Sequence, residues 1–230
     1  MKKQGANWSY LQEKRKSSIL VLSILILFTL NVKAQTFEVG AYAGAAYYLG
    51  DYNTSDHFKD SDLAYGGLLK YNINDRLSIG LSATQTTIVS DAANYNATFG
   101  QNEADLNLSL NELAITGEFN FFPYSTSEGN RLWTPYIFGG VGYFSSDYAD
   151  DFSMPFGLGI KINPVNKIGL NLFWGARKTF TDKIDNIYAG NPSSINYTGY
   201  NYDWYIFYGL NITFAFQLKK DTGCRNLIRR

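Results

Sequence analysis

The last long segment of the chain alternates between apolar residues and residues that are small, polar or mixed. From Trp204 to Leu218, every second side chain is apolar. This alternation places one face of a β-strand in an apolar solvent and the other in a tight, partly polar space. Its fifteen residues, at about 3.4 Å each and tilted by about 45°, rise roughly 36 Å, enough to cross an apolar band of about 25 Å. The pattern predicts a transmembrane strand that closes a β-barrel.

Seven earlier segments show the same period of two. The eight predicted strands are residues 37–49, 63–72, 76–88, 106–122, 134–144, 153–162, 168–180 and 204–218. The apolar positions of the fourth segment change parity midway, which predicts a β-bulge near Asn111 and Glu112. The predicted fold class is all-β: an eight-stranded, antiparallel, up-and-down transmembrane β-barrel of the outer-membrane type.

The connections between the predicted strands alternate in length. Residues 73–75, 123–133 and 163–167 are short or intermediate, whereas residues 50–62, 89–105 and 181–202 are long and rich in Asn, Asp and Ser. Outer-membrane barrels have short periplasmic turns and longer external loops. An even number of strands then leaves both termini in the periplasm, and we expect the protein in the outer membrane of a Gram-negative cell.

The interior of an eight-stranded barrel is filled by its own side chains. Positions predicted to face inward carry Lys70, Glu112, Glu118 and Arg177, together with several Tyr and Phe residues. We expect these side chains to form a satisfied plug, which leaves no room for an open solute pore.

The N-terminal region has the three parts of a secretory signal. Lys14, Arg15 and Lys16 precede an apolar run at residues 19–30, and Ala34 suits a cleavage site. The run is shorter than the roughly 20 apolar residues of a spanning helix, although a retained N-terminal anchor is the alternative. We expect a signal peptide at residues 1–34, the barrel at residues 35–218 and a cationic periplasmic tail at residues 219–230.

Composition and net charge limit the classes of molecule that the chain can be expected to bind. The chain has 18 Tyr, 16 Phe and 21 Gly residues, and no long apolar helix follows the predicted signal, which fits an exported barrel better than a soluble enzyme. Residues 35–218 contain nine basic and 18 acidic residues, a net charge of −9. This charge argues against nucleic acid as a partner and leaves outer-membrane lipid and lipopolysaccharide as the expected surroundings.

The predicted tail differs from the barrel in charge. It carries five basic residues, one acidic residue and the only cysteine of the chain. We expect it either to dock a periplasmic partner or to be a disordered overhang. Cys224 has no internal partner, so in an oxidising periplasm it is idle or forms an intermolecular disulfide. The candidate partner-binding residues are Lys219, Lys220, Cys224, Arg225, Arg229 and Arg230.

Catalytic chemistry has little support in the sequence. His57 is the only histidine and falls in a polar loop, where a solvated role is the usual one. The chain contains no G-x-S-x-G, H-E-x-x-H or C-x-x-C motif and no phosphate-binding glycine loop. We therefore expect a protein that is not an enzyme and has no catalytic residue and no cofactor.

Two groups of loop acids raise the question of a metal site. Asp147, Asp150 and Asp151 form one group, and Asp182 and Asp185 form the other. Carboxylates grouped in this way can hold calcium. We favour the simpler interpretation, in which they are solvated and meet lipopolysaccharide by repulsion or through divalent ions, and we expect no metal site.

Five motifs occur in an order that resembles one known group. They are YYLGD at residues 47–51, FFPY at 121–124, PYIFGGVG at 135–142, PFGLGIK at 155–161 and RKTFTDKID at 177–185. Together they extend over nearly all of the predicted barrel. The chain resembles the PorG-like proteins, outer-membrane barrels associated with the type IX secretion system. It departs from their pattern at Lys183 and Ile184, where an aromatic residue and a leucine are expected between the acids.

The resemblance implies an accessory, non-enzymatic role. A PorG-like barrel would link a periplasmic ring, formed by a lipoprotein and its partner, to the outer membrane. That machinery exports proteins with a C-terminal secretion signal and supports gliding motility in some bacteria. Two alternatives stay open: a structural or adhesive small barrel of porin-like type without a secretion role, and a lipid-modifying enzyme with His57 at the barrel rim.

Overall fold

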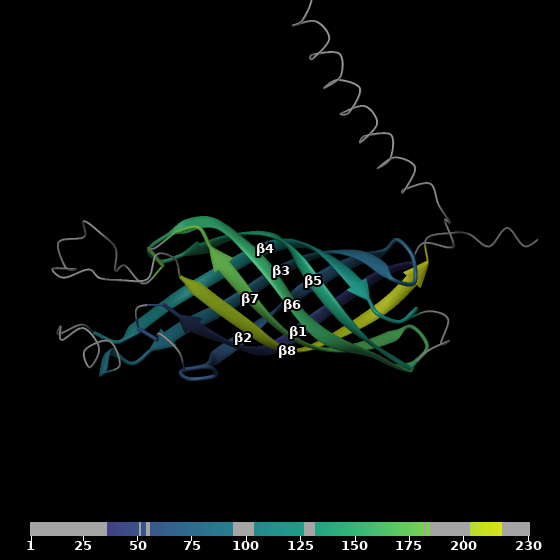
Figure 1. The fold of residues 1–230 in the computed structure, drawn as a ribbon, viewed down its shortest axis with the longest axis horizontal. Coiled ribbons are helices and arrows are strands. Elements are labelled where there is room, and N and C mark those ends of the chain that lie inside the picture. The colour runs from purple at the N-terminus through teal and green to yellow at the C-terminus, as the bar shows by residue number, and fades with distance from the viewer. Residues whose placement is uncertain are drawn as a thin grey trace, which may run out of the picture. The chain divides into compact units, whose positions relative to one another are not determined.

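Eight antiparallel strands form a closed barrel in a computed structural model of the chain (Figure 1). The structure describes residues 36–50, 52–53, 56–93, 104–126, 132–181, 183–184 and 203–217. The strands are β1 (Thr36–Leu49), β2 (Asp62–Asn72), β3 (Leu77–Ser90), β4 (Leu106–Asn120), β5 (Trp133–Ser146), β6 (Asp150–Val165), β7 (Ile168–Thr179) and β8 (Trp204–Gln217). The predicted signal peptide, residues 1–34, and the predicted tail, residues 219–230, lie outside the described residues.

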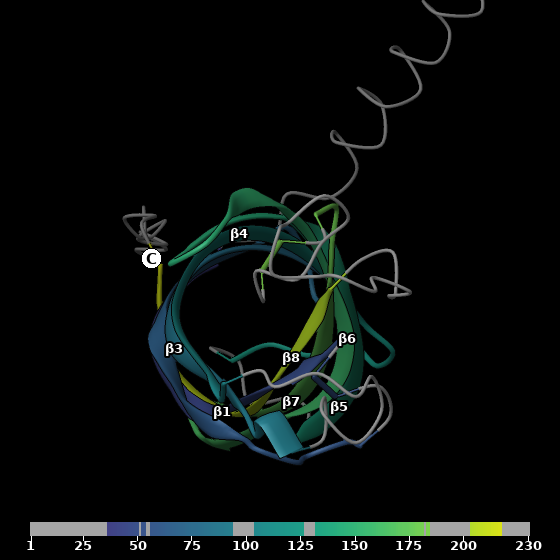
Figure 2. The same cartoon turned by 90° about the vertical axis from the view of Figure 1, so that its left-hand side faces the viewer.

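Each strand pairs with its neighbours in chain order, and β8 pairs with β1 to close the sheet. The closing register runs without interruption from the Thr36–Gln217 pair to the Leu49–Trp204 pair. Figure 2 looks along the barrel from the end that carries the long connections and shows the strands surrounding one axis. This topology confirms the predicted fold class. No helix in the described ranges is long and apolar enough to cross a membrane.

The two ends of the barrel differ. The turn end carries the connections β2–β3, β4–β5 and β6–β7, together with the first residue of β1 and the last residue of β8. The loop end carries the other four connections. The turn end and the loop end are distinguished by their connections and not by the side of the membrane.

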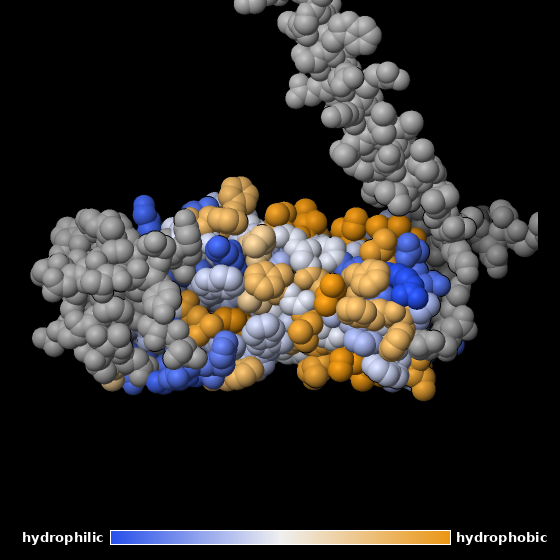
Figure 3. All heavy atoms as spheres, viewed as in Figure 1, coloured by the Kyte–Doolittle hydropathy of each residue, from blue (hydrophilic) through white to orange (hydrophobic). Residues whose placement is uncertain are grey.

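The outer wall has an apolar middle bordered by two circles of aromatic side chains, one near each end of the barrel. We call these circles the turn-end and loop-end aromatic rings. At the turn end, the Phe37 ring centroid lies 4.9 Å from that of Tyr71, and Phe122 lies 5.5 Å from Trp133. At the loop end, Tyr143 lies 5.6 Å from Phe152. The exposed middle of the wall includes Leu69, Leu81, Ile115, Val141, Leu158, Leu172 and Ile212. Figure 3 shows hydrophobic residues gathered along this wall and hydrophilic residues near its ends, the pattern of a surface solvated by lipid.

The predicted β-bulge in the fourth strand is wrong. The β3–β4 register continues without a shift from the Leu77–Phe119 pair to the Ser90–Leu106 pair. The apolar residues Leu106, Leu108 and Leu110 are buried and face inward, whereas the alternate residues 107, 109 and 111 are exposed. What changes along β4 is the surroundings: beyond the loop-end aromatic ring, the outside is polar and the inside is apolar. The irregularity that does occur is in β6–β7, between Ile162 and Val165.

Candidate functional site: a filled interior with two closed ends

Inward-facing charges in the turn-end half of the barrel form one cluster around Glu118 of β4. Its Oε2 atom lies 2.9 Å from Nζ of Lys70 on β2 and 2.6 Å from Nζ of Lys161 on β6. The hydroxyl of Ser78 donates a 3.1 Å hydrogen bond to the same oxygen. Both lysines are buried. Buried charges are costly unless they are paired and hydrogen-bonded, so the three strands must supply these groups together.

A second carboxylate completes the charge balance of this half. Glu38 of β1 is buried, and its Oε1 atom accepts hydrogen bonds from Nδ2 of Asn72 at 2.8 Å and from the hydroxyl of Thr126 at 2.7 Å. With Lys70, Lys161 and Glu118, it gives two positive and two negative charges. The turn-end half is therefore electrically neutral as well as filled.

A separate cluster occupies the loop-end half. Nε of Arg177 on β7 lies 3.4 Å from Oε1 of Glu112 on β4. The Glu112 Oε2 atom accepts hydrogen bonds from the hydroxyls of Tyr205 at 2.6 Å and Ser153 at 3.1 Å. The Arg177 guanidinium carbon lies 4.1 Å from the ring centroid of Phe207, a cation–π geometry. This cluster too carries no net charge.

Between the two clusters the interior leaves a cavity of about 60 Å³. Its lining includes the rings of Tyr42, Phe138 and Phe173 and the side chain of Asn211. Oδ1 of Asn211 is buried and has no hydrogen-bond partner within the described part of the chain. A cavity of this size has room for a few ordered waters, which would satisfy such an atom. These observations confirm the prediction that Lys70, Glu112, Glu118 and Arg177 form a plug.

The loop end is closed by apolar side chains. Ile88, Leu108 and Phe144 are fully buried there, and Ile184, from the β7–β8 connection, packs in the same cluster. Asp203 fixes this arrangement: its Oδ1 atom accepts a 2.5 Å hydrogen bond from the Tyr48 hydroxyl, and its Oδ2 atom accepts one of 3.0 Å from the Ile184 backbone N–H.

The turn end is closed by residues 121–126, which follow β4. The backbone N–H of Tyr124 donates to the carbonyl of Asp75 at 2.9 Å, and that of Lys167 donates to the carbonyl of Thr126 at 2.8 Å. Asn163 also donates to the Thr126 carbonyl. Tyr124 is buried, and burial raises the pKa of its hydroxyl well above the usual value. We call residues 121–126 the turn-end cap.

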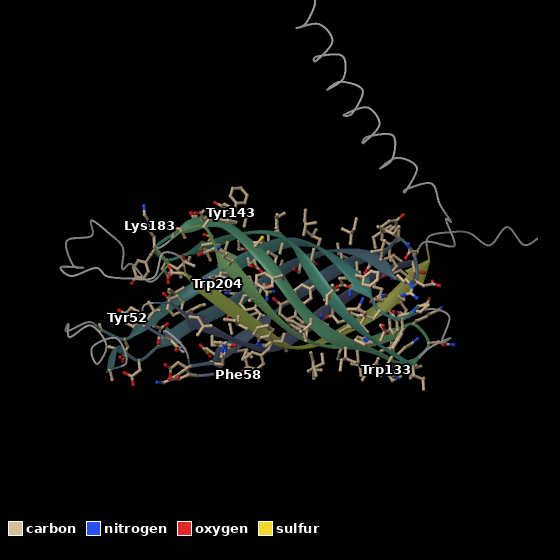
Figure 4. All side chains as sticks on the ribbon, viewed as in Figure 1. Tyr52, Phe58, Trp133, Tyr143, Lys183 and Trp204 are labelled. Carbon is tan, nitrogen blue, oxygen red and sulfur yellow. The ribbon has the colours of Figure 1, made fainter. Side chains whose placement is uncertain are left out.

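His57 lies on the outside of the wall and takes no part in either cluster. Its Nδ1 atom is 2.9 Å from the Tyr47 hydroxyl. The ring centroid of the neighbouring Phe58, labelled in Figure 4, lies 5.3 Å from that of Tyr47 and 5.1 Å from that of Tyr208. Tyr47 and Ile206 face outward but are buried at this place. His57 thus helps to hold the first loop-end connection against the wall.

The loop acids serve the backbone where they are described. Oδ2 of Asp147 accepts a 2.8 Å hydrogen bond from the N–H of Ser109, and Asp151 accepts one of 2.7 Å from the N–H of Phe152. Within the described ranges, no three His, Cys, Asp or Glu side chains lie together as metal ligands would. Asp182 and Asp185 are outside the described residues, as are all six candidate tail residues.

Several residues that close the barrel had no functional assignment from the sequence. Thr126, Ser153 and Tyr205 donate hydrogen bonds to buried carboxylates, and the buried carboxylate of Asp203 accepts one from the Tyr48 hydroxyl. The alternation along β6 and β8 could have placed Ser153 and Tyr205 inside. The alternation of strand residues could not place Thr126 or Asp203, because both lie outside the strands.

The comparison with protein families covers the whole barrel. The family model described as a domain of unknown function, DUF6089, matches residues 16–225. The chain belongs to the DUF6089 family. No curated protein matches the sequence. Membership gives this DUF6089 protein a family without giving it an activity.

Solved structures resemble this DUF6089 protein in fold. Neisserial surface protein A (NspA) is 10% identical over 78% of this chain and 97% of its own, with a TM-score of 0.53. Ail of Yersinia pestis, solved with the heparin analogue sucrose octasulfate, is 12% identical over 80% and 100%, with a TM-score of 0.46. OprG of Pseudomonas aeruginosa is 13% identical over 79% and 97%, with a TM-score of 0.44. At 10% identity, the likeness to NspA shows a shared barrel fold alone.

The geometry of the DUF6089 barrel limits what it can do. Its interior is occupied by neutral ion clusters, and ordered side chains close both ends. Three surfaces can still contact other molecules: the lipid-facing wall, the loop-end surface and the turn-end surface.

Proposed function

We propose that this DUF6089 protein is a non-enzymatic outer-membrane barrel that anchors a periplasmic ring complex of the type IX secretion machinery. The observation that carries the proposal is the turn-end cap, which closes this end through the hydrogen bond from Thr126 to Glu38. A closed end presents a fixed surface instead of a channel mouth. Such a surface suits docking.

The apolar wall supports the location. A wall of exposed Leu, Ile and Val bordered by aromatic rings requires lipid around it, because water would solvate it poorly. A closed barrel leaves no sheet edge with unpaired backbone groups in that lipid. The connection lengths support an orientation with the turn end and both termini in the periplasm, because short turns are typical of the periplasmic end of such barrels.

The secretion role rests on the resemblance to PorG-like proteins. Two of its motifs coincide with residues that close the barrel. FFPY at 121–124 begins the turn-end cap, and RKTFTDKID at 177–185 begins with Arg177 and includes Ile184. Ile184 stands where the PorG-like pattern has a leucine. Because isoleucine fills the apolar cluster at the loop end with a similar volume, this departure is conservative in packing terms.

We include the predicted tail in the proposed docking surface because of its charge. Lys219, Lys220, Arg225, Arg229 and Arg230 give it a strong positive charge next to a barrel of net negative charge. An acidic surface on the ring complex would attract it, and Cys224 would allow a covalent link. The expected partner is the periplasmic lipoprotein ring.

Co-purification tests the proposal. Full-length protein, a truncation after Leu218 and the variant Leu132→Glu are each extracted from outer membranes in mild detergent, and bound proteins are identified by mass spectrometry. Leu132 is 69% exposed at the turn end, so its replacement changes that surface without touching the interior. We expect the ring lipoprotein with the full-length chain and its loss on truncation.

Each outcome has a distinct meaning. Retention after truncation and loss with Leu132→Glu would move the contact from the tail to the turn-end surface. Absence of any ring component with the full-length chain would contradict the proposal. The link through Cys224 is tested by Cys224→Ser, which must remove a reductant-sensitive species of high mass that the unmodified protein forms.

A further inference from the structure

The outer wall carries a groove on β2–β5, close to the loop-end aromatic ring. Its volume is about 470 Å³, within the range of small-molecule sites. Gly66 and Ala83, which have no side chain or a small one, form its floor, and Tyr65 and Tyr143 are among its lining side chains. Figure 4 labels Tyr143 on the wall near the loop end.

The groove is crossed by a row of uncharged polar side chains. Tyr65, Gln85, Asn111 and Ser145 are consecutive register partners across four strands. All four are exposed and outward-facing. With neighbouring strands about 4.8 Å apart, the row is roughly 14 Å long. It presents two hydroxyls and two carboxamides, and the Tyr65 hydroxyl already donates a 3.0 Å hydrogen bond to Oε1 of Gln85.

The next rows toward the turn end are apolar. The first row next to the polar row consists of the register partners Gly67, Ala83, Leu113 and Tyr143. The second row, one step closer to the turn end, consists of Leu69, Leu81, Ile115 and Val141. The groove therefore crosses the boundary between acyl chains and headgroups. A ligand that spans this boundary is a lipid.

Charge restricts the kind of lipid. The outward positions of β2, β3, β4 and β5 carry no Lys or Arg within the described residues. Asp150 is the register partner of Ser145, and Asp147 caps Ser109 beside the same end. An anionic headgroup would therefore meet no cation on the outward positions of these four strands, and two carboxylates lie nearby, which disfavours phosphate. Hydroxyls of a sugar can donate to and accept from amide and hydroxyl side chains, and a sugar ring can pack on Tyr.

We infer that this groove binds one glycolipid of the surrounding leaflet through an uncharged sugar headgroup. The sugar lies on the row of Gln85, Asn111 and Ser145 between the two tyrosine rings, and an acyl chain lies below it over Ala83 and Leu113. This inference requires a membrane around the wall. It does not require the secretion role.

Native mass spectrometry of the full-length protein tests this site. The barrel is reconstituted in phosphatidylcholine nanodiscs that contain equal amounts of digalactosyl diacylglycerol, a neutral glycolipid, and phosphatidylglycerol, an anionic lipid. Lipids retained after release are counted. We expect one retained glycolipid per barrel, at least tenfold more often than phosphatidylglycerol.

Matched variants locate the binding. Ala83→Phe fills the groove floor and should abolish the preference, whereas Leu172→Phe adds a similar ring on β7, the strand opposite β3, and should leave it unchanged. Asn111→Leu removes hydrogen bonds from an exposed side chain and should lower retention about tenfold. Because all three residues face outward, heat-modifiable migration in gels verifies that each variant is a folded barrel.

The contradicting results are equally specific. Equal retention of the two lipids, preference for phosphatidylglycerol or phosphatidylcholine, or an unchanged preference in folded Ala83→Phe would overturn the inference. None of these results bears on co-purification with a periplasmic ring, so the two proposals fail separately.

Discussion

The hydroxyl of Thr126, in the turn-end cap, donates a 2.7 Å hydrogen bond to Oε1 of Glu38 on β1. These residues are 88 positions apart in the chain. The contact joins a connection after β4 to the first strand and ties the cap to the charge network inside the barrel. A closed turn end is therefore part of the folded structure.

Replacing Thr126 with valine should loosen the cap. The change keeps the shape of the side chain but removes a donor to a buried carboxylate, which costs about 1–3 kcal/mol. Equilibrium unfolding in urea, with the barrel in detergent micelles, measures the free energy of unfolding. Thr87→Val, on the outward face of β3, is the control and should change it by less than about 0.5 kcal/mol. Equal effects of the two variants would contradict a structural role for the Thr126 contact.

Glu118→Gln should destabilise the barrel more strongly. It leaves Lys70 and Lys161 buried beside a neutral amide, and breaking a buried ion cluster from one side costs about 3–5 kcal/mol. The same urea experiment gives the loss.

A compensating variant separates uncompensated charge from lost packing. Replacing Lys70 and Lys161 with methionine together with Glu118→Leu and Glu38→Gln removes all four charges of this half, and apolar replacements of buried ion pairs are often neutral or stabilising. The amide oxygen introduced by Glu38→Gln can still accept the hydrogen bonds from Thr126 and Asn72. We expect this quadruple variant to be more stable than Glu118→Gln; if it is less stable, uncompensated charge is not the cause.

Cysteine labelling should map the membrane boundary and the orientation. In a Cys224→Ser background, Asn107→Cys is expected to react in intact cells with a maleimide that cannot cross membranes, because Asn107 is outward and polar beyond the loop-end aromatic ring. Ile115→Cys, in the apolar band, should not react. Leu132→Cys, at the turn end, should react only after the outer membrane is permeabilised. Reversed accessibility of the first and third variants would place the loop end in the periplasm.

Electrical measurements should find no open pore. The two ion clusters and the closed ends leave an internal cavity of only about 60 Å³. We expect purified barrel in planar lipid bilayers to give no sustained conductance steps, with a general porin in the same bilayers as the positive control. Stable steps that scale with protein concentration would show that the plug opens.

The alternation of apolar and polar residues was sufficient to predict the fold. It predicted all eight strands, and the inward positions of Lys70, Glu112, Glu118 and Arg177, because side chains in a strand alternate between its two faces. It failed along β4. Leu106, Leu108 and Leu110 are apolar but face inward, because the barrel interior is apolar beyond the membrane band. A rule that places every apolar residue on the outside therefore predicts a change of parity where none occurs.

The closures of the barrel were not predictable from periodicity. Thr126 and Asp203 act from connections, where side-chain direction depends on tertiary contacts and not on a repeating backbone. The groove on β2–β5 was also not predictable from the sequence, because Gln85, Asn111 and Ser145 belong to three different strands. They form a row only once the register is known.

Deleting the gene and measuring protein export tests the central claim most directly. The proposal predicts that proteins with a C-terminal type IX secretion signal disappear from the medium and cell surface of the deletion strain, and that the full-length gene restores them. Unchanged export in a clean deletion would contradict the anchoring role and leave a structural barrel without a secretion function.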